Sequence, residues 1–493
     1  MLNIPKLKLG LVAVSRDCFP VELSQRRRDT ILEECKKVNF SVTGIETIVE
    51  NEKDVLKVLA EIRTNDINAL VIFLGNFGPE GPLSMLAQQF DGPVMVCAAA
   101  EETKDDLING RGDAYCGLLS ASYNFGLRNV RTYIPEYPVG TAPEIIDMMR
   151  EFSPVARVLI GLKRLKIFSF GPRPQDFNTC HAPLKPLYDL GVEVMENSEL
   201  DLYDLFQQTE DDPKIEKVEK EMAEELGAGN TYPDLLRKLA QLEVTLLNFY
   251  YENLGASEFG VFAIKCWPAF EKFFGCVPCY VNGRLAEKGI PVACEVDIYG
   301  VLSEYIGAVA TESTPTLLDV NNSVPRDMYE SAGDQVRDYK LNDLFMGFHC
   351  GNTASGCMKN AEIKHQLIMH RLMEPGETPN ITRGTLEGQL APSDITIYRL
   401  QSTASGELRA YIAQGEILDI DPQSFGGIGV FAIKGMGRFY RYALFEKDFP
   451  HHTAVVFKHA GKELHDIFKL LRVDDISVNL PQELYYPDEN PFK

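Results

Sequence analysis

The chain has 493 residues, and this length suggests about three domains. Its 45% hydrophobic and 24% charged content is that of an ordinary soluble globular protein. A formal net charge of −22 argues against a nucleic acid or an anionic membrane as a partner, because both require a basic surface. The eleven cysteines are odd in number and follow no framework spacing, which is typical of a reducing cytoplasm. No segment approaches the ~20 apolar residues that a membrane-spanning helix requires.

The first third of the chain alternates between short apolar runs and helical patterns. Strands are expected at 8–14, 41–49, 67–74 and 93–99, with helices at 22–37, 52–64 and 83–90. This alternation predicts a parallel sheet with helices on both faces, in a domain of residues 1–163. The glycine-rich turn after the third strand has no G-x-G-x-x-G, so a dinucleotide site is not indicated. Arg16 lies in the exit loop of the first strand, where it can meet a polar ligand or serve as a surface salt-bridge partner.

A second alternating unit begins at 165–177, where a strand runs into the rigid loop G-P-R-P with Arg173 at its tip. The elements expected after it are strands at 192–197 and 260–267 and before Glu295, with helices at 211–225, 233–253, 281–288 and 301–310. This pattern predicts a second α/β domain over 164–355. The acidic tract at 211–225 is most simply a solvated helix face.

The pattern changes after about residue 356. Short alternating runs separated by glycines are found at 393–401, 406–418, 426–435, 438–445 and 451–457, and a final helix is expected at 462–471. Such runs predict a closed or nearly closed antiparallel β-domain over 356–493. The expected fold class is therefore α/β, with two tandem Rossmann-like parallel-sheet domains followed by a C-terminal antiparallel β-barrel.

Two carboxylates and three histidines carry the chemistry. Glu295 in A-C-E-V-D and Asp319 in L-L-D-V-N-N each follow an apolar run that has the character of a buried strand end, where α/β domains gather ligands. An unpaired carboxylate there is costly, so it finds a cation, a hydrogen-bond donor or a metal. His349 in M-G-F-H-C-G-N and the pair His451–His452 lie downstream. The hypothesis is that Glu295, Asp319 and one of the pair hold a divalent metal; helix caps or salt bridges are the alternative.

The two adjacent histidines cannot be equivalent in an extended strand. Neighbouring side chains of a strand face opposite ways, so only one of the pair is expected to point into the site. We choose His452 as that ligand.

With these residues in view, most of the chain resembles the L-fucose isomerase and L-arabinose isomerase superfamily, and in particular its fucose-isomerase-like proteins. The segments that carry the resemblance are K-C-W-P-A-F (265–270), G-I-P-V-A-C-E-V-D (289–297), F-M-G-F-H-C-G-N (345–352), E-G-Q-L-A-P-S-D-I-T-I-Y-R-L (387–400) and F-P-H-H-T-A-V-V (449–456). The resemblance implies tandem α/β domains before a β-barrel. It also implies a catalytic divalent ion, usually Mn²⁺ with Mg²⁺ or Co²⁺ as substitutes, held by two acidic residues and a histidine.

By position in these motifs, Glu295 and Asp319 correspond to the acidic pair, with a second role as catalytic base and acid, and His452 to the metal-binding histidine. Aldose–ketose isomerisation of a monosaccharide through an enediolate is the implied reaction, because a divalent ion polarises the carbonyl whose neighbouring carbon loses a proton. Oxygen ligands with one imidazole suit Mn²⁺ or Mg²⁺ better than zinc.

The sugar hydroxyls need further partners. The candidates are Arg16, Arg173, Trp267, His349, Asn352 and His451. Trp267 is equally a core residue, and His349 equally a satisfied buried imidazole. The resemblance implies a homo-oligomer, commonly a hexamer, in which Arg16 acts in a neighbouring subunit's site, and the cysteine usage favours a cytoplasmic location. Two other functions stay open: a non-catalytic sugar-binding or regulatory protein on the same fold, and a metal-dependent hydrolase or lyase.

Overall fold

The computed structural model describes residues 1–492 and divides into two compact units. The N-terminal unit is Pro5–Ile160, and the larger unit comprises Met1–Ile4 and the chain from Gly161 onward. Helix α6 (Ala142–Leu162) runs from one unit into the other. Among the described helices, none combines the length and the apolar character that crossing a membrane demands.

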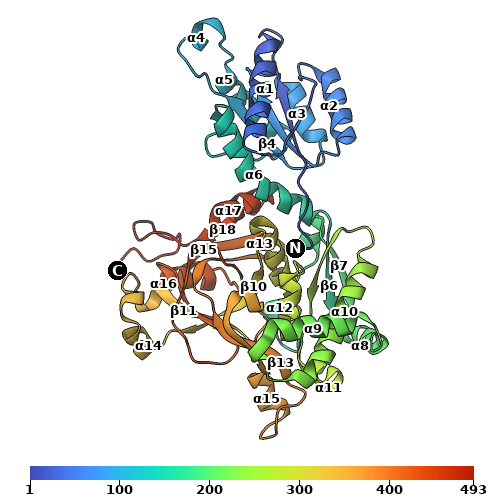
Figure 1. The fold of residues 1–493 in the computed structure, drawn as a ribbon. Coiled ribbons are helices and arrows are strands. Elements are labelled where there is room, and N and C mark those ends of the chain that lie inside the picture. The colour runs from blue at the N-terminus through green and yellow to red at the C-terminus, as the bar shows by residue number, and fades with distance from the viewer. Residues whose placement is uncertain (493) are drawn as a thin grey trace. The chain divides into compact units, whose positions relative to one another are not determined.

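The N-terminal unit is built on a five-stranded parallel sheet flanked by helices (Figure 1). Its strand order is β2-β1-β3-β4-β5. The strands are β1 (Leu9–Val14), β2 (Thr43–Gly44), β3 (Ala69–Leu74), β4 (Val94–Ala99) and β5 (Val139–Gly140). The other helices are α1 (Val21–Lys37), α2 (Glu52–Thr64), α3 (Glu80–Gln89), α4 (Asp106–Asn109) and α5 (Ala114–Leu127). This confirms the predicted parallel α/β architecture.

One predicted strand of this unit is largely absent from the sheet. The run 41–49 contributes only the two-residue strand β2 and an isolated bridge from Val49 to Val14. The segment still bonds to β1 through the N–H groups of Ile45 and Val49, which donate to Leu11 O and Ala13 O. Between these contacts side chains satisfy the backbone, because Arg28 donates to Ile45 O and Glu61 accepts from the backbone N–H of Glu46.

The larger unit contains a second, four-stranded parallel sheet with the order β7-β6-β8-β9. Its strands are β6 (Leu165–Phe170), β7 (Glu193–Asn197), β8 (Phe259–Ala263) and β9 (Val292–Ala293). The helices of this region are α7 (Lys185–Asp189), α8 (Glu199–Gln208), α9 (Lys214–Leu226), α10 (Leu236–Asn253), α11 (Phe270–Phe274) and α12 (Cys279–Glu287). Phenylalanines from β6, β8 and α10 pack edge-on and tilted in its core.

A closed antiparallel barrel of six strands completes this unit. The ring runs β16-β11-β10-β17-β14-β15 and returns to β16, with β12 and β13 beside β16 and with β18 beside β15. The strands are β10 (Pro315–Ser323), β11 (Leu344–His349), β12 (Met358–His365), β13 (Arg383–Leu390), β14 (Ser393–Ser402), β15 (Leu408–Leu418), β16 (Gly427–Ala432), β17 (His452–Val456) and β18 (Asp475–Val478). The predicted barrel is confirmed, but β10 and β11 enter it from before residue 356, upstream of the expected start.

One barrel prediction is wrong. The run 438–445 is not a strand but belongs to helix α16 (Met436–Phe439) and a π-helical turn, Tyr440–Phe445. Its buried residues Phe439, Ala443 and Leu444 recur with helical spacing, whereas Tyr440 and Phe445 are exposed. The aromatic content of the run suggested a strand, and the burial pattern shows why a helix forms.

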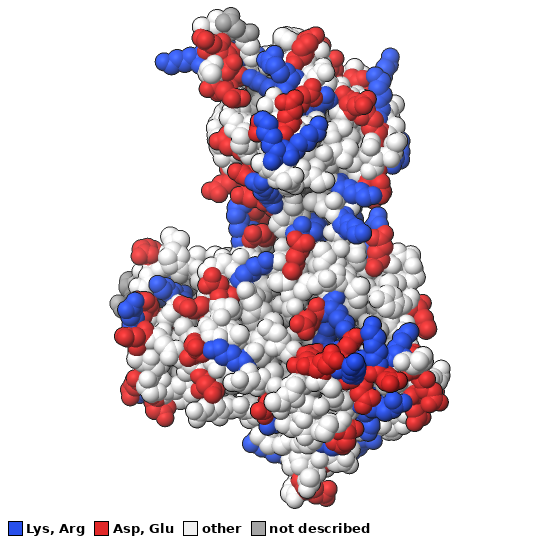
Figure 2. Space-filling view, in the orientation of Figure 1, with Lys and Arg blue, Asp and Glu red and all other residues white. Residues whose placement is uncertain are grey.

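Helix α13 (Ile298–Thr311) is buried at every position. It packs between barrel strands β10, β14 and β17 on one side and β8 and β9 of the central sheet on the other. The remaining helices are α14 (Arg326–Ser331), α15 (Leu367–Met373) and α17 (Gly461–Leu470). On the face drawn in Figure 2, acidic and basic side chains of the described residues are interspersed, with no broad basic area.

Candidate metal centre

The barrel ladder brings Asp319 and two histidines to one place. Asp319 lies directly opposite His452 in the pairing of β10 with β17, and opposite Phe348 in the pairing of β10 with β11. Side chains of directly opposed residues share a face at about 4.5–5.5 Å. Asp319 is therefore in the middle of a barrel strand, not beyond the end of an α/β strand as the sequence suggested.

Glu295 reaches the same place from a strained turn. It follows β9 in a 3₁₀ turn, Cys294–Val296, where Glu295 and Val296 have φ of 53° and 55°. Left-handed backbone is costly for a glutamate and more so for a β-branched valine, and such strain clusters at functional sites. The turn is held by the N–H of Val296, which donates to Ile264 O at 3.0 Å.

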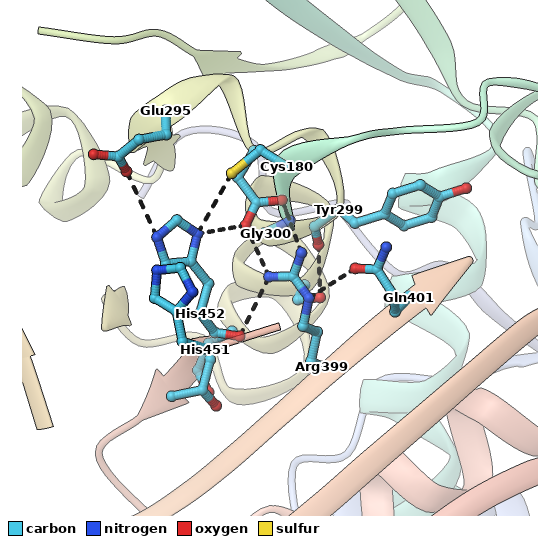
Figure 3. Close-up of polar contacts among 12 residues, drawn as sticks. Cys180, Glu295, Tyr299, Gly300, Arg399, Gln401, His451 and His452 are labelled. Carbon is cyan, nitrogen blue, oxygen red and sulfur yellow. Dashed lines mark hydrogen bonds and ion pairs between the residues drawn. The ribbon is translucent and has the colours of Figure 1, made fainter. Parts of the chain in front are cut away.

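The two predicted carboxylate ligands approach the same imidazole nitrogen. Glu295 Oε2 lies 3.6 Å from His452 Nε2 (Figure 3), and Asp319 Oδ1 lies 3.5 Å from it. These distances are too long for hydrogen bonds. Within residues 1–492, Glu295 Oε2 and Asp319 Oδ1 are both buried and lack a hydrogen-bond partner.

Buried acceptors without donors are expensive, and here both lie within 3.6 Å of His452 Nε2. Two carboxylate oxygens with one imidazole form the donor set that Mn²⁺ or Mg²⁺ accepts. The residues present therefore fit a divalent ion.

His451 does not point away from the centre. Its Nε2 lies 3.8 Å from Asp319 Oδ1, and its ring centroid is 4.5 Å from that of His452. The strand β17 begins only at His452, so the alternation of facing directions does not apply to His451. The expectation that only one of the pair faces the site is wrong. The His451 side chain is 37% exposed and that of His452 only 2%.

His349 faces the centre with a protonated ring nitrogen, Nε2–H. Its Nδ1 accepts the backbone N–H of Cys350 at 2.9 Å, which in a neutral ring leaves the proton on Nε2. That Nε2 lies 3.7 Å from Glu295 Oε2. His349 therefore offers the centre a donor, whereas a metal ligand must offer a lone pair.

The charges around Glu295 favour its ionised form. Burial acts to raise the pKa of Glu295, but the imidazoles of His349, His452 and His451 outweigh it, so the pKa lies below its usual value. Burial, followed by the charge of His452, lowers the pKa of His451. Glu295 is thus a carboxylate at neutral pH, which is the form that a ligand or a base requires.

Two functional candidates escaped the sequence analysis, namely Asp297 and Arg399. Asp297 Oδ2 lies 2.8 Å from His452 Nδ1, and Arg399 donates to both Asp297 oxygens at 2.8 and 2.9 Å. Burial opposes ionisation, but the Arg399 guanidinium and then His452 hold the pKa of Asp297 well below its usual range. The signals in the sequence were an arginine inside the apolar strand S-D-I-T-I-Y-R-L and an aspartate just before α13.

The predicted sugar-binding residues differ in how they are related to the centre. Trp267 is linked to the centre by Phe177. The ring of Phe177 packs edge-on against Trp267 and against His451, with centroid distances of 6.3 and 5.5 Å. Asn352 is buried, and its Oδ1 has no hydrogen-bond partner in the described chain. Arg173 donates to Asn178 Oδ1 at 2.6 Å, while its buried Nε has no partner among the described residues.

Arg16 belongs to the N-terminal unit. It lies just after β1, its guanidinium is 3.8 Å from Glu80 Oε1 and stacks 5.4 Å from the Phe77 ring. With Glu50–Glu52 and Pro79–Pro82 it lines a cavity of about 410 Å³. Its action in a neighbouring subunit's site stays a prediction.

Comparison with known proteins extends these observations. Residues 10–163 match the N-terminal domain model of fucose/sulfoquinovose isomerase, and residues 347–477 match the C-terminal domain model of L-fucose isomerase. A sulfoquinovose isomerase of Priestia aryabhattai is 24% identical over 472 residues, which cover 94% of this chain and 97% of that protein. A sulfoquinovose isomerase of Alkalicoccus urumqiensis is 27% identical over 328 residues, which cover 64% of this chain and 66% of that protein.

The matched domains and the fold that carries the polar cluster define an aldose–ketose sugar isomerase. More particularly, the chain belongs to the fucose-isomerase-like superfamily.

Proposed function

We propose that the protein is a divalent-metal-dependent isomerase that converts an aldose to a ketose through an enediolate. The observation that carries this proposal is the convergence of Glu295 Oε2 and Asp319 Oδ1 on His452 Nε2, at 3.6 and 3.5 Å, with neither oxygen hydrogen-bonded in the described chain. Glu295, Asp319 and His452 would hold the ion, and His451 stands close enough to add a fourth ligand. When bound, the metal supplies positive charge against the negative charge that develops on the first two sugar oxygens.

The reaction itself moves a proton from C2 to C1 of the sugar and transfers a hydrogen from O2 to O1. Glu295 and Asp319 are the carboxylates available as base and acid, a role that typically contributes about 10²–10⁴-fold. The Nε2–H of His349 faces the centre and can donate to a sugar oxygen. Trp267 and Phe177 form an aromatic wall beside His451 against which the apolar face of a sugar can pack.

For the substrate we propose sulfoquinovose, the sugar named for both relatives. Its 6-sulfonate is an anion that needs a cation at the distal end of the pocket. Arg173 is the candidate, because its loop ends at Phe177, which contacts both His451 and His452, and because its buried Nε has no partner among residues 1–492. L-Fucose, named in the C-terminal domain model, is the competing substrate.

The test is an assay of the EDTA-treated protein with and without added Mn²⁺, on sulfoquinovose, L-fucose and D-glucose, with products identified by NMR. We expect a ketose that forms only when Mn²⁺ is restored, and fastest from sulfoquinovose. Binding without turnover of any sugar would instead indicate a non-catalytic binder, and release of a fragment would indicate a hydrolase or lyase.

Arg173→Gln tests the proposed anion contact. It is expected to lower kcat/KM for sulfoquinovose at least about tenfold while changing that for an unsubstituted aldose little, because only the sulfonate loses a charged partner. An equal loss on both sugars would contradict the assignment. We also propose a homo-hexamer with a trans role for Arg16, on the basis of family resemblance, and a cytoplasmic location, on the basis of the cysteine usage.

A further inference from the structure

A buried Asp–Arg pair stands behind the metal-facing histidine (Figure 3). Asp297 and Arg399 have side chains that are 2% and 1% exposed, and the guanidinium grips both carboxylate oxygens. Gln401 Oε1 accepts the Nε–H of Arg399 at 2.8 Å, and the N–H of Gly300 donates to Asp297 Oδ1 at 2.8 Å. Every strong contact of Asp297 is therefore one in which its oxygens accept.

The remaining contact of Asp297 decides where the proton of His452 lies. Asp297 Oδ2 is 2.8 Å from His452 Nδ1, a hydrogen-bond distance. Because a carboxylate so placed is acceptor-only, Nδ1 must be the donor. In the neutral ring, Nε2 then carries a lone pair, and it is Nε2 that faces Glu295 Oε2 and Asp319 Oδ1.

His349 shows that this arrangement is not a general consequence of the fold. Its Nδ1 accepts a backbone N–H from Cys350, so its neutral tautomer carries the proton on Nε2. Two imidazoles with ring centroids 5.9 Å apart are thus held in opposite tautomers by different partners. One offers the centre a lone pair, and the other offers it a donor.

We infer that Asp297 and Arg399 form a positioning pair that locks His452 in the Nδ1–H tautomer and fixes its ring, with Arg399 holding the carboxylate in place. Partners of this kind behind metal-binding histidines are worth 10–100-fold in metal affinity. The inference rests on the proposed metal site for its purpose, but the tautomer itself is a property of the metal-free protein.

Asp297→Asn reverses the contact in a defined way. Arg399 donates to both oxygens, but Oδ1 also accepts from the backbone N–H of Gly300, whereas Oδ2 faces His452. Because the imidazole can change its tautomer and the backbone N–H cannot, the amide oxygen is expected at the position of Oδ1. The amide nitrogen then takes the position of Oδ2 and presents donors to His452 Nδ1. The His452 ring must then accept at Nδ1 and carry its proton on Nε2. In this tautomer Nε2 has no lone pair for a metal. An asparagine also remains a good cap for α13.

The experiment uses the full chain labelled with ¹⁵N-histidine, treated with EDTA and examined by solid-state NMR, with His452→Ala to assign the signal. We expect protonated Nδ1 and unprotonated Nε2 for His452 in the wild type, and the reverse in Asp297→Asn, with His349 unchanged. In calorimetric titrations, Mn²⁺ should bind Asp297→Asn about 10–100-fold more weakly than the wild type.

Glu243→Gln is the matched control. It disrupts another buried Arg–carboxylate pair, in which Arg284 Nε lies 2.6 Å from Glu243 Oε2, without touching a histidine. It should leave both the His452 tautomer and the Mn²⁺ affinity unchanged. If Asp297→Asn fails to fold because Arg399 is left unpaired, the double variant Asp297→Asn/Arg399→Gln removes that charge and should show the same reversed tautomer.

A wild-type His452 with its proton on Nε2, or an Asp297→Asn protein with unchanged tautomer and affinity, would overturn the inference. A wild type with the expected tautomer that binds no Mn²⁺ would overturn the proposed function and leave the assignment of the tautomer to Asp297 intact.

Discussion

Two clusters of buried carboxylates in the larger unit differ in whether the chain itself supplies partners for their negative charge. In the Arg284 cluster, Glu243 is fully buried, and its two oxygens contact Arg284 Nε at 2.6 Å and Lys288 Nζ at 3.5 Å. Arg284 also pairs with Glu225, which accepts from Ser355 at 2.7 Å. In the metal centre, Glu295 and Asp319 each leave an oxygen without a hydrogen-bond partner in the described chain.

The difference separates a structural cluster from a functional one. Buried carboxylates are retained only when paired, hydrogen-bonded or bound to a metal. The Arg284 cluster supplies its own cations and joins α9, α10 and α12. In the metal centre, the two orphan oxygens lie near the lone pair of His452 Nε2, and the Nε2–H of His349 stays 3.7 Å from Glu295, so a bound cation is the partner that we propose for them. Removing carboxylates from each cluster should therefore have opposite consequences for activity and for stability.

The largest expected effect is on turnover. Glu295→Gln and Asp319→Asn should each lower kcat by about 10²–10⁴-fold, because each removes a proposed metal ligand and proton-transfer group. Initial rates of ketose formation measure this, and far-ultraviolet circular dichroism checks the fold. Glu243→Gln should keep kcat within about twofold. Activity within threefold of wild type in either site variant would remove the distinction between the clusters.

The next effect concerns the two adjacent histidines. His452→Ala should weaken Mn²⁺ binding by two orders of magnitude or so, because His452 Nε2 lies between both orphan oxygens. His451→Ala should cost tenfold or less, because His451 is more exposed and lies near Asp319 alone. Calorimetric titration of both variants gives the comparison, and the reverse order would make His451 the ligand.

Glu304, a third buried carboxyl on α13, differs from both clusters because it keeps its proton at neutral pH. Burial, and then the charge of Asp297, raises the pKa of Glu304 to about 8. In the unfolded chain this carboxyl has its ordinary pKa of 4.5, so between pH 4.5 and pH 8 folding must take up a proton. The resulting loss of stability is absent below pH 4.5 and grows as the pH rises toward 8.

Glu304→Gln removes this titration. It should therefore raise the free energy of unfolding at pH 7.5, by an amount on the order of 2–4 kcal/mol, and change it little at pH 4.5. Urea melts of both proteins at the two pH values give the answer. A gain of equal size at both pH values would show that the carboxyl is not held neutral by burial.

A smaller effect is expected from metal removal. An ion that binds only the folded chain adds about 2.7 kcal/mol at one hundred times its dissociation constant. EDTA should lower the melting temperature of the wild type by a few degrees and that of Glu295→Gln much less. Equal shifts in both proteins would place the stabilising ion at another site.

Much of this architecture could be predicted because local patterns agree with it. Helix α2 begins with an asparagine cap and ends where its apolar periodicity ends, and A-C-E-V-D follows a recognisable strand. The residue types suggested Glu295, Asp319 and one histidine of the pair as ligands, but spacing alone could not bring them together, because the meeting of Asp319 with His452 depends on barrel register between segments more than a hundred residues apart.

What escaped prediction depends on contacts between distant segments. The strand expected at 41–49 is shortened to Thr43–Gly44, and the side chains of Arg28 and Glu61, which no local pattern reveals, bond part of the backbone that follows. His451 faces the centre because β17 begins one residue later than assumed. Arg399 was passed over because its partner, Asp297, lies 102 residues away and on another element.

The most direct test of the central claim is the stoichiometry of Mn²⁺ binding to the metal-free protein, measured by calorimetry and checked by electron paramagnetic resonance. The account predicts about one tightly bound ion per chain in the wild type and in Glu243→Gln, and its loss in Glu295→Gln and Asp319→Asn. Tight binding of Mn²⁺ that survives both site substitutions, or full isomerase activity in a protein stripped of metal, would contradict it.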